Sequence, residues 1–272
     1  MKIKSLLASA VTIVFCLYAA SVWAGDIVIK GSTTVLPIAQ KVAESYMKEH
    51  PDVKISISGG GSGNGIKALI DGSTDIANAS RFIKDKEVAL AVEKGRYPVP
   101  FAVAYDCIIP VVHPSNPMTD ITMRQLNAIY KGEVKNWKDI GGPNMPVVVI
   151  SRDTSSGTYE VWQEKVLEKD KVFPGALLQA SNGAVVQAVS KNKNAIGYIG
   201  LGYLDSSIKD LTVNRIKGSP ESTTNGTFPI SRALFMFTNG WPTGDTANFI
   251  NYVMNPEKGQ KYVGEIGFVP LY

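Results

Sequence analysis

The sequence predicts an α/β protein with two lobes. Three times along the chain, a short apolar strand runs through a turn rich in hydroxyl groups or glycine into a helix, and strands and helices alternate elsewhere. Two long apolar segments, residues 101–112 and 231–238, bracket the central part of the chain. We interpret these segments as paired strands that cross between the lobes, and we expect the ligand to lie between the lobes.

The first 24 residues have the pattern of a secretory signal peptide. Lys2 and Lys4 precede a mostly apolar stretch, residues 6–20, and compact side chains occupy the −3 and −1 positions, Val22 and Ala24. The apolar stretch is short for a membrane anchor. We therefore expect cleavage after Ala24 and a soluble, exported protein in the periplasm.

Charge and composition are those of an ordinary globular protein, with 44% hydrophobic and 19% charged residues. The net charge of +4 includes the two lysines of the signal peptide, and the remainder is too small and dispersed to indicate a nucleic-acid or membrane surface. Cleavage would leave one cysteine, Cys107, so we expect no intramolecular disulfide and a buried, inert thiol. We also expect a monomer.

The first strand–turn–helix unit places three hydroxyl side chains side by side. Residues 26–30 predict a strand that enters the turn Gly31-Ser32-Thr33-Thr34. A helix follows, with apolar residues spaced along one face and Pro37 in its first turn, where the missing N–H has no cost.

Glycine dominates the turn of the second unit. Apolar and polar residues alternate over 53–58, which predicts a strand, and residues 59–65 (GGGSGNG) connect it to a helix over about 66–70. The glycines let the backbone approach a ligand closely, and Ser62 lies near the helix start. A flexible linker is the alternative, although a linker this short between a strand and a helix is unusual.

The third unit adds a cation to the same pattern. Residues 147–150 predict a buried strand, residues 151–158 (SRDTSSGT) are rich in hydrogen-bond donors, and a helix follows over 160–167. The first turn of a helix has unpaired N–H groups and a positive dipole end, so such a turn can bind an oxyanion. Arg152 precedes the turn, and its planar guanidinium can hold two oxygens at once. A helix cap beside a surface arginine is the alternative, and the repetition of the pattern favours the oxyanion site.

The remaining pattern completes the alternation of strands and helices. It predicts a strand over 75–79 that ends at Ser80 and Arg81, a charged surface helix over 84–94, a helix over 123–130 with Thr122 as its N-cap, a helix over 184–189 capped by Ser181-Asn182-Gly183, a strand over 195–199, a loop over 218–227 and a helix over 247–254.

Catalytic and cofactor motifs do not occur in the sequence. The phosphate-loop and dinucleotide motifs, G-x-S-x-G, H-E-x-x-H and clustered Cys/His ligands are all missing. A nucleophilic Ser156 would need a positioned base, and the two histidines, His50 and His113, each precede a proline and read as surface or loop residues. We therefore expect a binding protein without a cofactor or metal, and not an enzyme.

Six motifs in order resemble the phosphate-binding protein of bacterial ABC phosphate transporters, and most closely the shorter branch of that family. They are GSTTVLP (31–37), GGGSGNGIKAL (59–69), DIANASR (75–81), SRDTSSGTY (151–159), SNGAVVQAV (181–189) and NAIGYIGLGY (194–203). The resemblance spans nearly the whole chain after the signal peptide. It implies a type II periplasmic-binding fold whose lobes close on inorganic phosphate and deliver it to a membrane permease. A sensor or scavenger without a permease, or a serine-type phosphatase, are the alternatives.

The resemblance also assigns phosphate-binding roles. Ser32, Thr33 and Thr34 match the first phosphate loop and Ser62 matches the second; Arg152, Ser156, Gly157 and Thr158 match the third, with Arg152 as the charge partner and Gly157 as a backbone N–H donor. Together with the crossing strands, it suggests lobe 1 over 25–106 and 231–272 and lobe 2 over 107–230.

One departure from the family leaves selectivity open. In its best-known members, an aspartate near the end of the strand that matches DIANAS accepts a proton from phosphate and so excludes sulfate. Here the matching position holds Ser80 or Arg81. Arg81 is then a second cationic ligand, or else it pairs with a carboxylate at the rim of the cleft. Asp153 orients Arg152, caps the turn, or is a surface carboxylate.

Overall fold

The structure, a computed structural model, describes residues 26–272. The expected signal peptide and its cleavage after Ala24 lie outside the described residues. The helices are α1 (Leu36–Glu49), α2 (Ser62–Ile70), α3 (Asp85–Glu93), α4 (Met123–Tyr130), α5 (Gly157–Lys165), α6 (Asn182–Ser190), α7 (Pro220–Thr224), α8 (Gly244–Met254) and α9 (Gly259–Glu265), with 3₁₀ turns η1 (Trp137–Ile140) and η2 (Leu201–Tyr203). The strands are β1 (Asp26–Gly31), β2 (Lys54–Ser58), β3 (Ile76–Ala79), β4 (Pro98–Val112), β5 (Asp120–Ile121), β6 (Val148–Arg152), β7 (Leu177–Gln179), β8 (Ala195–Gly200), β9 (Lys209–Asp210), β10 (Thr212–Val213) and β11 (Ser231–Asn239).

One mixed sheet runs through the molecule in the order β2-β1-β3-β11-β4-β8-β6-β7, with β9 beside β4. The pairs β1–β2, β1–β3, β6–β7 and β6–β8 are parallel, as expected where a helix connects successive strands. β11 pairs antiparallel with β4 along its whole length, from Ser231 opposite Cys107 to Asn239 opposite Pro98, and the remaining end of β4 pairs with β8. The predicted pairing of two long crossing strands is confirmed.

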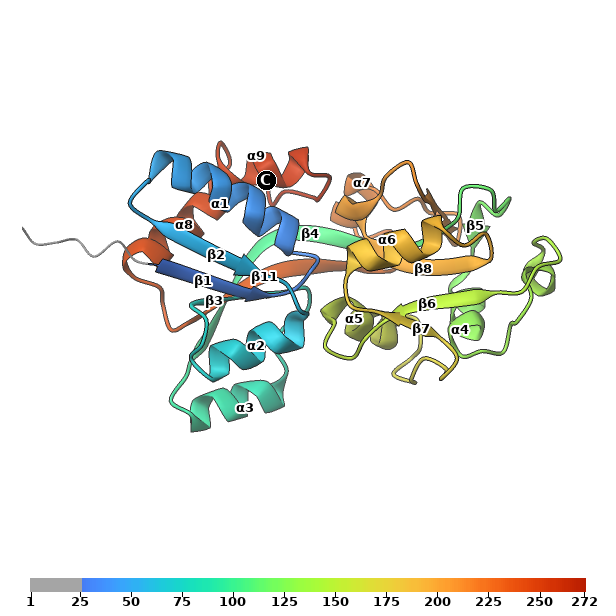
Figure 1. Ribbon diagram of the computed structural model, residues 1–272, viewed down its shortest axis with the longest axis horizontal. Helices are drawn as coiled ribbons and strands as arrows, with labels where there is room; N and C mark the ends of the chain where they lie inside the picture. The colour runs from blue at the N-terminus through green and yellow to red at the C-terminus, as the bar shows by residue number, and fades with distance from the viewer. Residues whose placement is uncertain (1–25) are drawn as a thin grey trace, which may run out of the picture.

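Two groups of elements lie at the two ends of these crossing strands, which run from one group into the other (Figure 1). Lobe 1 contains β1–β3 with α1–α3, α8 and α9, and its core has one buried cluster on each face of the sheet. Lobe 2 contains β5–β8 and β10 with α4–α7, and it has one large core of its own. The residue bounds of the lobes given above stay a prediction.

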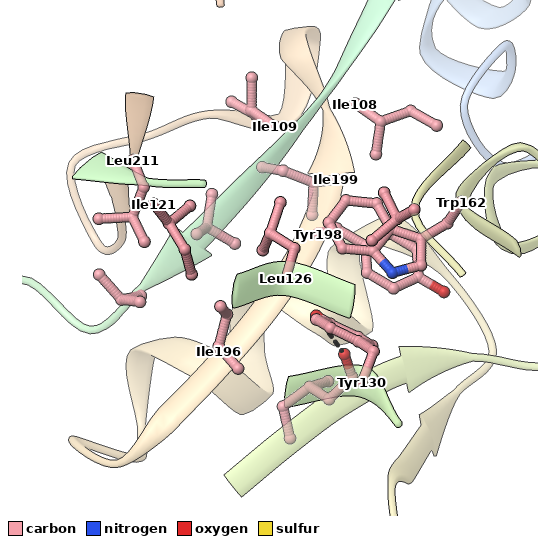
Figure 2. Close-up of a cluster of buried hydrophobic side chains, with 14 of the residues drawn as sticks. Ile108, Ile109, Ile121, Leu126, Tyr130, Trp162, Ile196, Tyr198, Ile199 and Leu211 are labelled. Atoms are coloured by element: carbon pink, nitrogen blue, oxygen red, sulfur yellow. Dashed lines mark hydrogen bonds between the residues drawn. The ribbon is translucent and has the colours of Figure 1, made fainter. Parts of the chain in front are cut away.

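Aromatic rings link the core of lobe 2 to the end of β6. Figure 2 shows Trp162, Tyr198 and Tyr130 together, and the rings of Trp162 and Tyr198 stack with centroids 4.2 Å apart. The hydroxyl of Tyr198 accepts a hydrogen bond from the backbone N–H of Arg152 at 3.1 Å and lies 2.9 Å from the Ser151 Oγ. The buried core therefore fixes the backbone from which the Arg152 side chain starts.

Several predicted helices begin earlier than their apolar pattern. α2 starts at Ser62 and not near residue 66, because the N–H of Gly65 already bonds to the carbonyl of Gly61. α5 starts at Gly157 and α6 at Asn182. In each case polar or glycine residues of the turn form the first helical turn, which an apolar periodicity cannot register.

The prediction of a loop over 218–227 was wrong in part, since α7 lies within it. The Oγ of Ser219 accepts a hydrogen bond from the N–H of Ser222 at 3.1 Å, and Pro220 occupies the first helical position. Cap and proline together start a five-residue helix in a segment whose composition is typical of a loop.

Cys107 should be unreactive in the native protein. It is fully buried, and burial raises the pKa of its thiol to about 12. We expect iodoacetamide at pH 8 to label Cys107 of the mature protein in urea but not in buffer, as measured by mass spectrometry. Comparable labelling rates in both would contradict the buried position.

No helix within residues 26–272 is both long enough and apolar enough to cross a bilayer.

Candidate functional site

Four helices begin around one point between the lobes. α1 and α2 come from lobe 1, and α5 and α6 come from lobe 2, with their first turns facing one another (Figure 1). Each of these helices has at least nine residues. Because the start of a helix offers free N–H groups and a positive dipole end, this arrangement favours an anion at the centre.

The first loop folds around the side chain of Ser32. Its Oγ accepts hydrogen bonds from the N–H groups of Thr34 at 3.1 Å and Val35 at 3.3 Å, and its own N–H donates to the carbonyl of Asn78 at 2.8 Å. The Ser32 side chain thus shapes the turn, whereas the hydroxyl of Thr34 is directed to the other lobe.

Contacts across the cleft join the hydroxyl groups of the two lobes. The Oγ1 atoms of Thr34 and Thr158 lie 3.0 Å apart. Asn182, at the start of α6, donates from Nδ2 to the Oγ1 of Thr34 at 3.0 Å and of Thr33 at 3.2 Å. All four side chains are buried. The starts of α1, α5 and α6 therefore meet directly.

The start of α5 touches the second loop at Gly157. A Cβ at this position would lie 2.4 Å from the Oγ of Ser62 and 2.8 Å from the Oγ of Ser80. The Oγ of Ser62 itself accepts a hydrogen bond from the N–H of Ser80 at 2.9 Å. Glycine is therefore required here for space, because α5 meets lobe 1 without room for a side chain.

The third loop is held by its own polar groups. Asp153 accepts from the N–H of Ser155 at 2.8 Å, and the Oγ of Ser156 accepts from the N–H of Tyr159 at 3.2 Å. Ser156 is the N-cap of α5. Asp153 therefore caps the turn, which was one of the expected alternatives, and it has no hydrogen bond to Arg152.

Arg152 is a buried cation without a carboxylate partner among the described residues. Only 1% of the residue is exposed; its Nε donates to the carbonyl of Gln179 at 2.9 Å and its Nη2 to that of Ala180 at 3.0 Å. Its Nη1 is buried and has no hydrogen-bond partner within residues 26–272. Burial lowers the pKa of the Arg152 guanidinium, and the nearby charge of Arg232 acts in the same direction. A buried positive charge of this kind needs a negative partner.

Arg232 on β11 is a second buried cation, which no motif in the sequence indicated. Its Nη1 donates to Thr158 Oγ1 at 3.1 Å and its Nη2 to Thr34 Oγ1 at 3.3 Å, so it lies against both lobes. Its Nε and Nη2 also donate to one oxygen of Asp106, at 3.0 and 2.7 Å. Burial raises the pKa of the Asp106 carboxyl, and the Arg232 guanidinium opposes that rise.

Asp106 holds the guanidinium of Arg232 in place, and both of its carboxylate oxygens accept hydrogen bonds. Its second carboxylate oxygen accepts the N–H of Leu201 at 2.9 Å. Asp106 cancels the charge of Arg232, so the two arginines and the one aspartate leave a single uncompensated positive charge.

Arg81, expected either as a second cationic ligand or as a partner of a carboxylate at the cleft rim, is paired with carboxylates. Its Nη1 and Nη2 donate to the two oxygens of Glu87 at 2.8 and 2.7 Å, and its Nε lies 2.7 Å from an oxygen of Glu160. The carboxylates hold the guanidinium at the edge of the cleft, because the bidentate pair of hydrogen bonds to Glu87 determines its orientation. The geometry favours the alternative, a rim ion pair, and Arg232 is the buried cation that contacts hydroxyl groups of both lobes.

Neither histidine lies near the loops. The ring of His50 stacks on Tyr46, with centroids 4.3 Å apart, and the Nδ1 of His113 lies 2.8 Å from the Oγ of Ser115. The described residues thus give the hydroxyl of Ser156 no histidine base.

Comparison with known proteins gives a consistent result. A family model described as a PBP superfamily domain matches residues 19–257. The phosphate-binding protein PstS of Staphylococcus saprophyticus is 34% identical over 260 residues, which cover 91% of this chain and 81% of that protein. The protein of the same name from Pseudomonas aeruginosa is 32% identical and covers 91% of this chain and 83% of its own.

Solved structures agree in fold as well as in sequence. A phosphate ABC transporter substrate-binding protein from Clostridium perfringens, with bound phosphate, has a TM-score of 0.85 at 32% identity and covers 91% of this chain and 100% of that chain. An ABC-type phosphate transport receptor from Vibrio cholerae has a TM-score of 0.73 at 30% identity, covering 89% of this chain and 99% of that one. These matches confirm the predicted type II periplasmic-binding fold. The chain belongs to the PBP superfamily and, within it, to the family of PstS phosphate-binding proteins.

Proposed function

We propose that this protein captures inorganic phosphate between its lobes and delivers it to an ABC permease. The observation that carries the proposal is Arg152, a buried guanidinium with a free Nη1 among four helix starts. The uncompensated charge there is one positive unit, which a phosphate anion balances. The hydroxyl groups around it can donate to phosphate oxygens and can also accept a phosphate proton.

The proposed ligand set combines loop residues with the second arginine. Arg152 supplies charge, helix starts supply N–H groups, and hydroxyl and amide side chains fix orientation. The set is Ser32, Thr33, Thr34, Ser62, Arg152, Ser156, Gly157 and Thr158, with Asn182 and Arg232 added. Arg81 is left out because its guanidinium is bound to Glu87 and Glu160.

We further propose export and a periplasmic location after cleavage of residues 1–24, with lobe 1 over 25–106 and 231–272 and lobe 2 over 107–230. In this arrangement phosphate closes the lobes, and the closed monomer docks on the permease. A sensor or scavenger with the same site would bind phosphate in the same way, and only transport assays with the permease distinguish them. A phosphatase would need a base beside Ser156, where neither histidine lies.

Calorimetric titration of the unfolded, dialysed and refolded protein tests phosphate capture. We expect one phosphate per chain. A parallel titration measures the difference in affinity between phosphate and sulfate, which hydroxyl groups alone do not set, because a hydroxyl can accept the phosphate proton or donate to a sulfate oxygen. The carboxylate of Asp106 contributes little to this difference because its oxygens are already engaged. Equal binding of the two anions would make the protein a general oxyanion binder, and no binding of either would overturn the proposal.

A further inference from the structure

We propose that Glu160 fastens the closed lobes as an ionic clasp and thereby sets how long phosphate stays bound. The proposal rests on the proposed function and adds a positioning residue that does not belong to the ligand set. Glu160 lies on α5 of lobe 2, and its partners, Arg81 and Lys84, belong to lobe 1.

The contacts converge on one carboxylate oxygen. The Oε2 of Glu160 lies 2.7 Å from the Nε of Arg81, and the ammonium group of Lys84 pairs with the same oxygen. Within residues 26–272, these are the only ion pairs that join an element of lobe 1 to an element of lobe 2. If Glu160 is substituted, no other ion pair within the described residues therefore connects the two lobes.

Contacts within lobe 1 orient the Arg81 side chain independently of Glu160. Glu87 accepts two hydrogen bonds from Arg81 and one from the N–H of Lys84 at 2.9 Å. Burial opposes the charge of Glu87, but these hydrogen bonds prevail and lower the pKa of its carboxyl. The Arg81 fork is thus held in place by its own lobe, with Nε left for Glu160.

Because it is partly buried, the clasp should contribute more free energy to the closed state than an ion pair on the surface does. The side chains of Arg81 and Glu160 are 7% and 13% exposed, whereas Lys84 is 43% exposed. Exposed ion pairs contribute little, and solvent screening falls as a pair is buried. The pair Arg81–Glu160 is therefore the stronger half of the clasp, and Lys84 is the weaker half.

Chain connectivity couples the clasp to the phosphate site. Arg81 directly follows Ser80, whose hydroxyl packs on Gly157, and Glu160 lies two residues after Thr158 on the first turn of α5. When α5 meets lobe 1 at Gly157, Glu160 reaches Arg81 in the same movement. The clasp forms only in the closed state, so its free energy favours closure without affecting ligand entry.

The variant Glu160→Gln should bind phosphate about tenfold more weakly, with the whole loss in a faster dissociation rate. Stopped-flow fluorescence, with Trp162 beside the site as reporter, measures association and dissociation rates separately. Lys84→Gln should give a smaller change in the same direction. In 1 M NaCl the difference between the parent and Glu160→Gln should shrink.

Glu164→Gln is the matched control. Glu164 lies one turn further along α5, lines the same interlobe cavity of about 510 Å³ as Glu160 and Arg81, and forms no ion pair within the described residues. It should leave both rates unchanged within twofold. Urea unfolding without phosphate should give the same midpoint for Glu160→Gln and the parent, because the open protein lacks the clasp.

Two results would overturn the clasp. One is a dissociation rate of Glu160→Gln within twofold of the parent while Arg152→Gln weakens binding roughly a thousandfold; the proposed function then stands without the clasp. The other is a lower urea midpoint for Glu160→Gln than for the parent in the absence of phosphate. Glu160 would then stabilise the open protein and be a structural residue. If the parent itself binds no phosphate, the proposed function fails and the clasp fails with it.

Discussion

Replacing Arg152 with glutamine is expected to weaken phosphate binding roughly a thousandfold. The bound anion would lose the one buried cation that has no carboxylate partner, and breaking a buried charge pair costs about 3–5 kcal/mol. Arg152→Lys should rescue only part of this loss, because an ammonium group cannot donate to Gln179, Ala180 and the anion in the same planar geometry. Calorimetric titration measures the change.

The control for this prediction is Arg124→Gln, an exposed arginine of lobe 2 on α4. It should leave the affinity unchanged within twofold. Circular dichroism of Arg152→Gln checks that the variant folds. An affinity of Arg152→Gln within tenfold of the parent would contradict the proposed role of Arg152.

Adding one methyl group at Gly157 is expected to prevent full closure. The new Cβ of Gly157→Ala would lie 2.4 Å from the Oγ of Ser62, so α5 could not approach lobe 1 as it does here. Overpacking of this kind costs about 1–3 kcal/mol, which predicts phosphate binding weaker by about 10- to 100-fold. The phosphate-free protein should keep its stability, because the clash arises only when the lobes close.

Gly183→Ala provides the matched change at the start of α6. A Cβ there would meet only the Oγ of Ser181, at 3.9 Å, so affinity should be unchanged. Small-angle X-ray scattering then distinguishes the two variants: phosphate should compact Gly183→Ala as it does the parent and Gly157→Ala less. Full compaction of Gly157→Ala with parental affinity would contradict the close contact between α5 and Ser62.

The parts of the site that the sequence predicts are those with local signals. Each strand, its glycine or hydroxyl turn and the following helix start lie within a short stretch of sequence. They place Ser62 and Ser156 at helix starts and Ser32 in the turn before α1, as expected. The structure also brings Thr34 of the first loop against Thr158 of the third, two loops that the family resemblance assigns to one site.

The residues that sequence reasoning missed depend on distant pairing. Arg232 stands directly opposite Asp106 in the β11–β4 ladder, and this register cannot be read from either segment alone. The sequence places Asn182 in the cap of a helix, and its amide contacts Thr34 only when the two lobes come together. Arg81 stays open between a ligand and a rim ion pair in the sequence, because its carboxylate partner Glu160 lies on the other lobe, about eighty positions along the chain. In each case the pattern gave the residue and its strand or turn, but not its partner.

The position of the bound anion decides whether phosphate binds between the four helix starts. A crystal of the refolded protein grown with arsenate, an anion of the shape and charge of phosphate, locates the arsenic by its anomalous scattering. We expect one peak between the starts of α1, α2, α5 and α6, with oxygens within hydrogen-bond distance of the Arg152 Nη1 and of Arg232. A peak outside these four helix starts, or one that Arg152 does not contact, would contradict the proposed site.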